Sequence, residues 1–117
     1  LSLIVVVVIV WSTLSLLRES VTLAMDAVPA GIDPAAVRAY LAALPGVGDL
    51  HDLHIWPMST TETALTCHLL MPQGHPGDAF LAKVSGELAQ RFRIQHATLQ
   101  IEIGDASPCV LAPEHTV

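Results

Sequence analysis

The sequence predicts an α+β fold, in which two helices pack on a three-stranded sheet and follow a helix that is apolar enough to cross a membrane. Three observations predict it. Residues 1–17 carry no charge, two later segments have apolar residues at helical spacing, and three others have the β-branched, aromatic or alternating apolar content of strands. A helix with one apolar stripe and a sheet with one apolar face cover each other, so the order α-β-β-α-β indicates a two-layer sandwich.

The N-terminal segment accounts for an unusually apolar composition. Of 117 residues, 52% are hydrophobic and only 14% are charged. A helix over residues 1–17 would span about 26 Å, slightly less than the roughly 30 Å hydrocarbon core of a bilayer. Because the chain begins with Leu1 and not with Met, we expect a fragment that starts inside a transmembrane helix. A signal peptide, which needs a basic region before its apolar stretch, and a buried soluble helix are the alternatives.

Proline, glycine and capping residues divide the rest of the chain. Helical spacing continues through residues 17–28, and Pro29 and Gly31 should end the helix. Asp33 and Asp78 are the predicted N-caps of two further helices. The predicted elements are a helix over 33–44, strands over 47–57 and 64–71, a helix over 78–93 and a strand over 96–103. The predicted units are the membrane helix with its cytosolic extension at 1–28, a hinge linker at 29–32, a domain at 33–104 and a flexible tail at 105–117.

Charge and motif content exclude several classes of protein. The net charge is −6 with five Lys and Arg residues, whereas a nucleic-acid-binding surface needs basic residues to neutralise phosphates. Two cysteines do not make a disulfide framework, which favours a reducing compartment. The sequence contains neither a nucleophile elbow nor a glycine-rich phosphate loop, so an enzyme is the weakest interpretation.

Histidines concentrate in residues 51–70, which carry three of the six in the chain. On a strand, the odd spacing of His51 and His54 would place their side chains on opposite faces of the sheet. A tight turn near residues 59–60 would instead pair His51 with His68 across two strands. Their Cβ atoms would then lie about 4.5–5.5 Å apart, close enough for both imidazoles to bind one zinc ion. We favour this metal site over a sheet face whose histidines bind nothing.

Other donors could join the predicted site. Asp49 and Asp52 could supply oxygen ligands beside His51, and Cys109 could reach back from the tail as a thiolate. His96 and Glu102 should face outward on the third strand but lie about 20 Å apart, too far to bind one ion within a single chain. Using both would therefore require two sites or a dimer.

A further set of residues is expected to be structural. We expect Cys67 in the core, because free cysteine is among the most buried residue types. His54 beside Trp56 is more simply explained as a packed, hydrogen-bonded histidine than as a ligand, and His75 and His115 as solvated side chains.

Four motifs in sequence then point to a family: "LLRESVTLAMDAVPAGID", "LPGVGDLHDLHIW", "ALTCHLL" and "IQHATLQIE". In order and spacing they resemble the C-terminal part of the cation diffusion facilitator family, metal-ion/proton antiporters that export zinc, cadmium, cobalt, iron or manganese from the cytosol. The resemblance covers nearly the whole chain, from the end of the sixth transmembrane helix onward. It implies a cytosolic αββαβ domain with a metallochaperone-like (ferredoxin-like) fold, which forms a V-shaped homodimer that closes on binding metal.

The resemblance also implies roles for single residues. His51 and His68 fall on recurrent ligands of the cytosolic metal site, and zinc-transporting members also use the positions of His96, Glu102 and, in some members, Cys109. Asp26 falls on an acidic hinge residue between the membrane and cytosolic parts. Some members have an additional histidine where this chain has Phe80 and Leu81.

The function implied is that of a cytosolic metal-binding and dimerisation domain in a multi-pass efflux transporter of the cell (inner) membrane, in contact with membrane lipid. Zinc, or another divalent transition metal, would be both substrate and regulator. The transport site, which members build on their second and fifth transmembrane helices, is not expected in this sequence. The alternatives are a tethered metal chaperone or sensor, and a dimerisation module without metal.

Overall fold

The structure, a computed structural model, describes residues 1–104 and Cys109. The tail predicted at 105–117, and with it His115, therefore lies outside the described residues except for Cys109. The element order is the predicted one: α1 (Ser2–Ala24), α2 (Pro34–Ala42), β1 (Asp49–Pro57), β2 (Thr63–Leu70), α3 (Asp78–Phe92) and β3 (His96–Glu102). The predicted α+β class, with an N-terminal helix before the domain, is confirmed.

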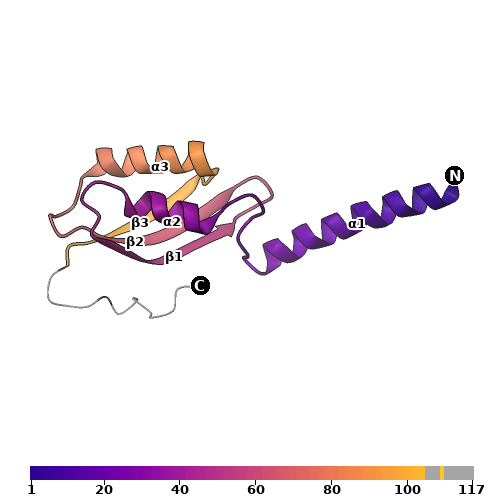
Figure 1. Ribbon diagram of the computed structural model, residues 1–117, viewed down its shortest axis with the longest axis horizontal. Helices are drawn as coiled ribbons and strands as arrows, with labels where there is room; N and C mark the ends of the chain where they lie inside the picture. Colours follow the sequence, from indigo (N-terminus) through magenta and orange to yellow (C-terminus); the bar gives the residue numbers. More distant parts are fainter. Residues whose placement is uncertain (105–108, 110–117) are drawn as a thin grey trace.

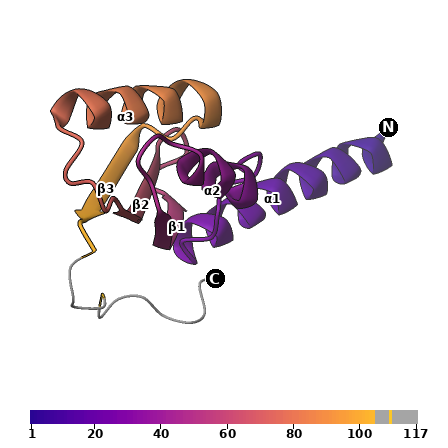
Figure 2. The ribbon, with the colours of Figure 1, turned by 60° about the vertical axis from the view of Figure 1, so that its left-hand side comes forward.

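The three strands form one sheet in the order β1-β2-β3. The β1 and β2 strands are antiparallel, and β2 and β3 are parallel, with α3 as the connection between them. Both α2 and α3 lie on the same face of the sheet, as Figures 1 and 2 show. Helix α2 contacts β1, and α3 contacts β3. The domain is therefore a two-layer sandwich, and within the described residues no helix covers the opposite sheet face.

The hydrophobic core fills the space between the helices and the sheet. Its largest side chains with less than 2% exposure come from α2, α3, β2 and the loop before β3: Leu41, Leu65, Leu69, Leu88, Ile94, Val37, Val84 and Cys67. Burying one such aliphatic side chain stabilises a fold by about 1.5–3 kcal/mol. The prediction that Cys67 belongs to the core is confirmed. None of the described core residues belongs to α1, so this core is built from the domain alone.

Of the two predicted N-caps, the structure confirms one and contradicts the other. The Asp33 side chain accepts a hydrogen bond of 2.9 Å from the Ala35 amide, and Pro34 is the first helical residue, as predicted. The prediction that Asp78 caps α3 is wrong, because Asp78 is itself the first helical residue and Gly77 is the N-cap. With a φ of 87°, Gly77 has a backbone conformation that glycine adopts without steric cost.

Helix α1 is separate from the core and extends away from the domain (Figure 1). Its 23 residues span about 34 Å at about 1.5 Å per residue, and by length and composition it is able to cross a membrane. Ser12 and Thr13 both donate their hydroxyl hydrogens to the Ile9 carbonyl, so these polar groups are satisfied within the helix. The helix ends at Ala24 and not near residue 28 as predicted, since Asp26 adopts a left-handed φ of 49° that a helix cannot continue through.

We predict an unusually high ionisation midpoint for Tyr40, the only tyrosine in the chain. Burial, together with the 2.9 Å hydrogen bond that its hydroxyl donates to Glu87, raises the pKa of Tyr40 to about 12. The absorbance of the phenolate should therefore have its midpoint near this value. The contribution of protonated Tyr40 to the stability of the fold should fall as the pH rises from about 10 to 12. Glu87→Gln should lower the midpoint only in part, because burial remains. A midpoint near 10 in a chain that circular dichroism shows to be folded would contradict this.

Candidate metal centre

The candidate centre begins with the pairing of β1 and β2. His51 lies opposite His68, as predicted, and their ring centroids are 5.1 Å apart. The prediction that His51 and His54 lie on opposite faces is wrong. A bulge between them shifts the register, so that His54 lies opposite Thr66, and Thr66 shares its sheet face with His68. Both histidines of β1 therefore lie on the face that α2 and α3 leave uncovered.

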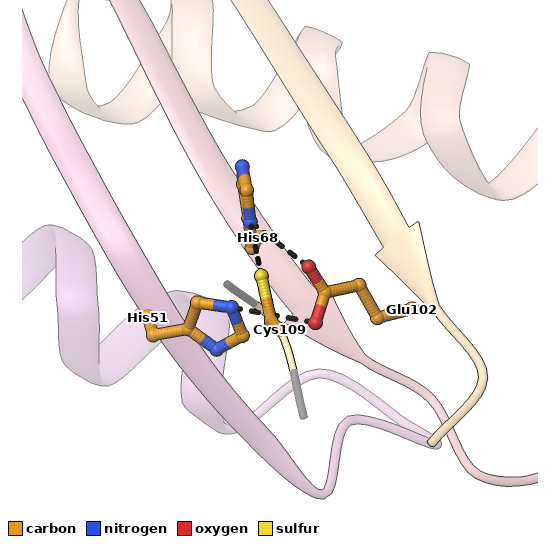
Figure 3. Close-up of side chains that lie close together, drawn as sticks. All are labelled: His51, His68, Glu102 and Cys109. Atoms are coloured by element: carbon orange, nitrogen blue, oxygen red, sulfur yellow. Dashed lines mark hydrogen bonds and ion pairs between the residues drawn. The ribbon is translucent and has the colours of Figure 1, made fainter. Parts of the chain in front are cut away.

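Strand β3 brings a carboxylate to the same place. Because β3 runs parallel to β2, its last residue, Glu102, lies beside Leu70, at the end of β2 that carries His68. Glu102 Oε1 is 2.9 Å from His68 Nδ1, and Glu102 Oε2 is 3.3 Å from His51 Nε2. One carboxylate thus contacts both imidazoles, one with each oxygen (Figure 3).

Cys109 completes the group, with its Sγ 3.7 Å from His68 Nδ1. One donor atom from each of His51, His68, Glu102 and Cys109 can be chosen so that all lie within 4.8 Å of one another. Figure 3 shows the four side chains converging, the first three from three neighbouring strands. The structure therefore brings together four of the five metal-site residues that the sequence predicted.

The polar atoms of this cluster are only partly satisfied by one another. His51 Nε2 is buried, and among the described residues it has no aligned hydrogen bond, although Glu102 Oε2 is nearby. The Glu102 carboxylate is better supported. A hydrogen bond from Cys109 lowers the pKa of Glu102 most, and Gln100 and the two histidines lower it further, against the effect of burial. Glu102 therefore stays ionised at neutral pH, while a buried imidazole nitrogen beside it lacks an aligned partner.

These donors fit a tetrahedral transition-metal ion. Ligand atoms about 2.1 Å from a tetrahedral zinc ion lie about 3.4 Å from one another. The three distances given above, 2.9, 3.3 and 3.7 Å, lie near this value. The whole group of donors spans up to 4.8 Å, so the side chains would move closer together around an ion. Imidazole nitrogen, thiolate sulfur and carboxylate oxygen are also the donor types that zinc selects. His51 Nε2, which has no aligned hydrogen bond among the described residues, would gain a bond to the ion in such a site.

The fifth predicted residue, His96, lies elsewhere. It begins β3, at the opposite end from Glu102, and its Nε2 is 3.7 Å from Glu62 Oε1. This agrees with the expectation that His96 and Glu102 cannot bind one ion within a single chain. A ligand role for His96 stays a prediction that would require another ion or another chain.

Two further residues differ in their relation to the cluster. The side chain of Asp49 accepts a hydrogen bond from the Leu50 amide and is outside the group of converging donors. Gln100, which the sequence analysis did not single out, donates to Glu102 Oε1 at 3.1 Å and lies 3.5 Å from His68 Nδ1. The alternation of β3 could have identified it, because it predicts that Gln100 and Glu102 share a face.

The remaining predicted residues lie away from the cluster. Asp26 lines an open cavity of about 760 Å³ between the end of α1, α2 and β1, and its hinge role stays a prediction. His54 is hydrogen-bonded, as predicted, with its Nε2 2.9 Å from Asp52 Oδ1. The prediction that it is packed is wrong, because its side chain is 58% exposed. His75 accepts a hydrogen bond from the Gly77 amide through its Nδ1.

Comparison with known proteins places this arrangement in a family. Residues 29–103 match the family of cytoplasmic domains of cation efflux proteins. The human proton-coupled zinc antiporter SLC30A2 is 33% identical over 96 residues, which are 82% of this chain and 26% of the antiporter. The metal cation efflux system protein CzcD of Cupriavidus metallidurans is 35% identical over 95 residues, 80% of this chain and 29% of CzcD. The chain thus spans less than a third of the length of either relative.

A solved structure has the same fold. The metal-bound C-terminal domain of the CzcD transporter from Cupriavidus metallidurans superposes with a TM-score of 0.55 at 35% identity. The match covers 61% of this chain and 99% of the CzcD chain. The matched domain is therefore the αββαβ part of this protein. Because residues 29–103, most of the chain, match the family of cytoplasmic domains, the chain belongs to the cation efflux protein family and contains its cytoplasmic domain.

Proposed function

We propose that this chain is the C-terminal part of a divalent metal efflux transporter, whose cytoplasmic domain binds zinc at His51, His68, Glu102 and Cys109. The convergence of four donor atoms within 4.8 Å carries the proposal. Zinc is the first candidate because of the mixed nitrogen, oxygen and sulfur donors. Cadmium and cobalt are alternatives, since such donors bind several metals.

The charges of the donors suit a divalent ion. Glu102 is ionised, and its pKa is held below the usual range chiefly by the hydrogen bond from Cys109. Cys109 would lose its proton on binding, as thiol ligands do, so the site would supply two negative charges. The two histidines would bind as neutral imidazoles, the form in which histidine binds metals. The bound ion would therefore be electrically neutralised although His68 is buried.

The wider function follows from the relatives and from α1. We propose that the full protein is a multi-pass metal/proton antiporter of the cell (inner) membrane, in which α1 contacts lipid and the domain lies in the cytoplasm. The named relatives are transporters, which agrees with the expectation that the protein is not an enzyme. In a homodimer, metal at the uncovered sheet face would favour a closed arrangement of the two domains, provided that this arrangement binds metal more tightly.

Calorimetric titration of zinc into the full chain in detergent micelles tests the metal site. We expect saturable binding that His51→Ala weakens more than about 100-fold. This loss is larger than the usual effect of changing a residue that contacts a ligand but not the metal. The matched control is His96→Ala, which should leave this affinity unchanged because His96 pairs with Glu62 at the other end of β3. Equal zinc affinity in the wild type and His51→Ala would refute the site.

Cobalt(II) tests whether Cys109 is the sulfur ligand. A thiolate bound to cobalt gives a charge-transfer band in the near ultraviolet, which we expect in the wild type and not in Cys109→Ser. The other cysteine provides the control. Burial raises the pKa of Cys67 to about 12, so its sulfur should stay protonated, and Cys67→Ala should keep the band. A band that survives Cys109→Ser would exclude Cys109 as the sulfur ligand.

A further inference from the structure

The Asp52 carboxylate connects two histidines from a position inside the bulge of β1. Asp52 has a left-handed φ of 52°, and it lies where the register between His51 and His54 shifts. Its Oδ1 is 2.9 Å from His54 Nε2, and its Oδ2 is 3.5 Å from His68 Nε2. The bulge thus directs the carboxylate toward the sheet face of the metal cluster, although Asp52 is outside the group of converging donors.

The two ring nitrogens of His68 face different partners. Nδ1 faces the cluster, 2.9 Å from Glu102 Oε1 and 3.7 Å from Cys109 Sγ. Nε2 points away from the other three side chains in Figure 3, toward Asp52. Since His68 is only 7% exposed, these protein groups and not bulk solvent set the orientation of its ring.

A neutral imidazole carries one N–H group and one lone pair, so a partner that accepts the hydrogen determines which nitrogen is free. An anionic acceptor at Nε2 favours the tautomer that has its hydrogen there and its lone pair on Nδ1. Among the described residues, Asp52 supplies the carboxylate on the Nε2 side of His68, at 3.5 Å, and Glu102 supplies the one on the Nδ1 side, at 2.9 Å, where it competes for the hydrogen. An ion bound by Glu102 would end this competition and leave Asp52 as the anionic acceptor. Carboxylates placed behind a metal-binding histidine orient the ring and raise its basicity.

We propose that Asp52 is a positioning residue for the metal centre, which accepts the Nε2 hydrogen of His68 and so directs the Nδ1 lone pair at a divalent transition-metal ion. This inference rests on the proposed metal-binding function. His54 holds the other carboxylate oxygen and limits rotation of the Asp52 side chain. Asp52 acts on the ion only through His68.

Two substitutions of Asp52 test the inference in the full chain in detergent micelles, with zinc as the probe. Asp52→Asn removes the charge and keeps the size, and asparagine tolerates a positive φ. Asp52→Gly removes the acceptor altogether and also suits this backbone conformation. We expect zinc affinity to fall about 10-fold to 100-fold, more in the glycine variant than in the asparagine variant.

His54→Ala is the matched control. It removes the hydrogen-bond partner of Asp52 on the side away from the cluster but leaves the carboxylate beside His68. Its effect on zinc affinity should be clearly smaller than that of Asp52→Gly. An effect as large as that of Asp52→Gly would assign the role to the His54–Asp52 pair as a support for the bulge and would overturn the proposal.

The tautomer of His68 gives a readout that a purely structural role would not change. Long-range ¹H–¹⁵N correlation spectra of the zinc-loaded wild type should show the hydrogen on Nε2 and the metal on Nδ1. Asp52→Gly, at zinc concentrations that saturate it, should show this arrangement together with the reverse one, in which the hydrogen is on Nδ1 and the metal on Nε2. Metal bound through Nε2 in the wild type would overturn the proposal.

The outcomes separate this inference from the function on which it rests. A wild type that binds zinc, with Asp52 variants of equal affinity, would overturn the role of Asp52 alone and leave the metal site intact. A wild type that binds no zinc would overturn both.

Discussion

The pairing of β1 with β2 is the constraint on which the candidate metal centre depends. It places His51 opposite His68 on the sheet face that the helices leave open. A shift of one residue in this pairing would move every side chain of one strand to the other face. The apolar residues of β1 and β2, which pack under α2 and α3, oppose such a shift. The buried core therefore holds the polar site in register.

The parallel pairing of β2 with β3 adds the acidic component. Because α3 returns the chain to the start of β3, Glu102 ends its strand beside the end of β2. Two imidazoles, a carboxylate and a thiol then share a small volume. A divalent ion would replace these mutual contacts by stronger ones, and its binding free energy would add to the stability of the folded domain.

Sequence reasoning reached the parts of this site that depend on local spacing. His51 and His68 were paired correctly because two differences offset each other. The pairs next to the turn, such as Pro57 with Thr63, are displaced by one residue from the predicted register, and the bulge between His51 and His54 restores it. The bulge at Asp52 was missed because it needs a left-handed backbone conformation at this residue, and aspartate adopts that conformation only in some contexts. The approach of Glu102 to both histidines depends on which strand lies at the centre of the sheet. Strand order is a tertiary property that alternation along one strand does not determine.

The two faces of the sheet divide stability from chemistry. The helix-covered face contains the aliphatic core, while the site side chains lie on the other face and add little to that core. A substitution such as His51→Ala should therefore change metal binding with little effect on folding. His68 is the exception, since it is buried although it lies on the open face, and its removal would leave a void. Changes at Asp52 alter the surroundings of His68 without removing its ring, so they separate the orientation of this ligand from its packing.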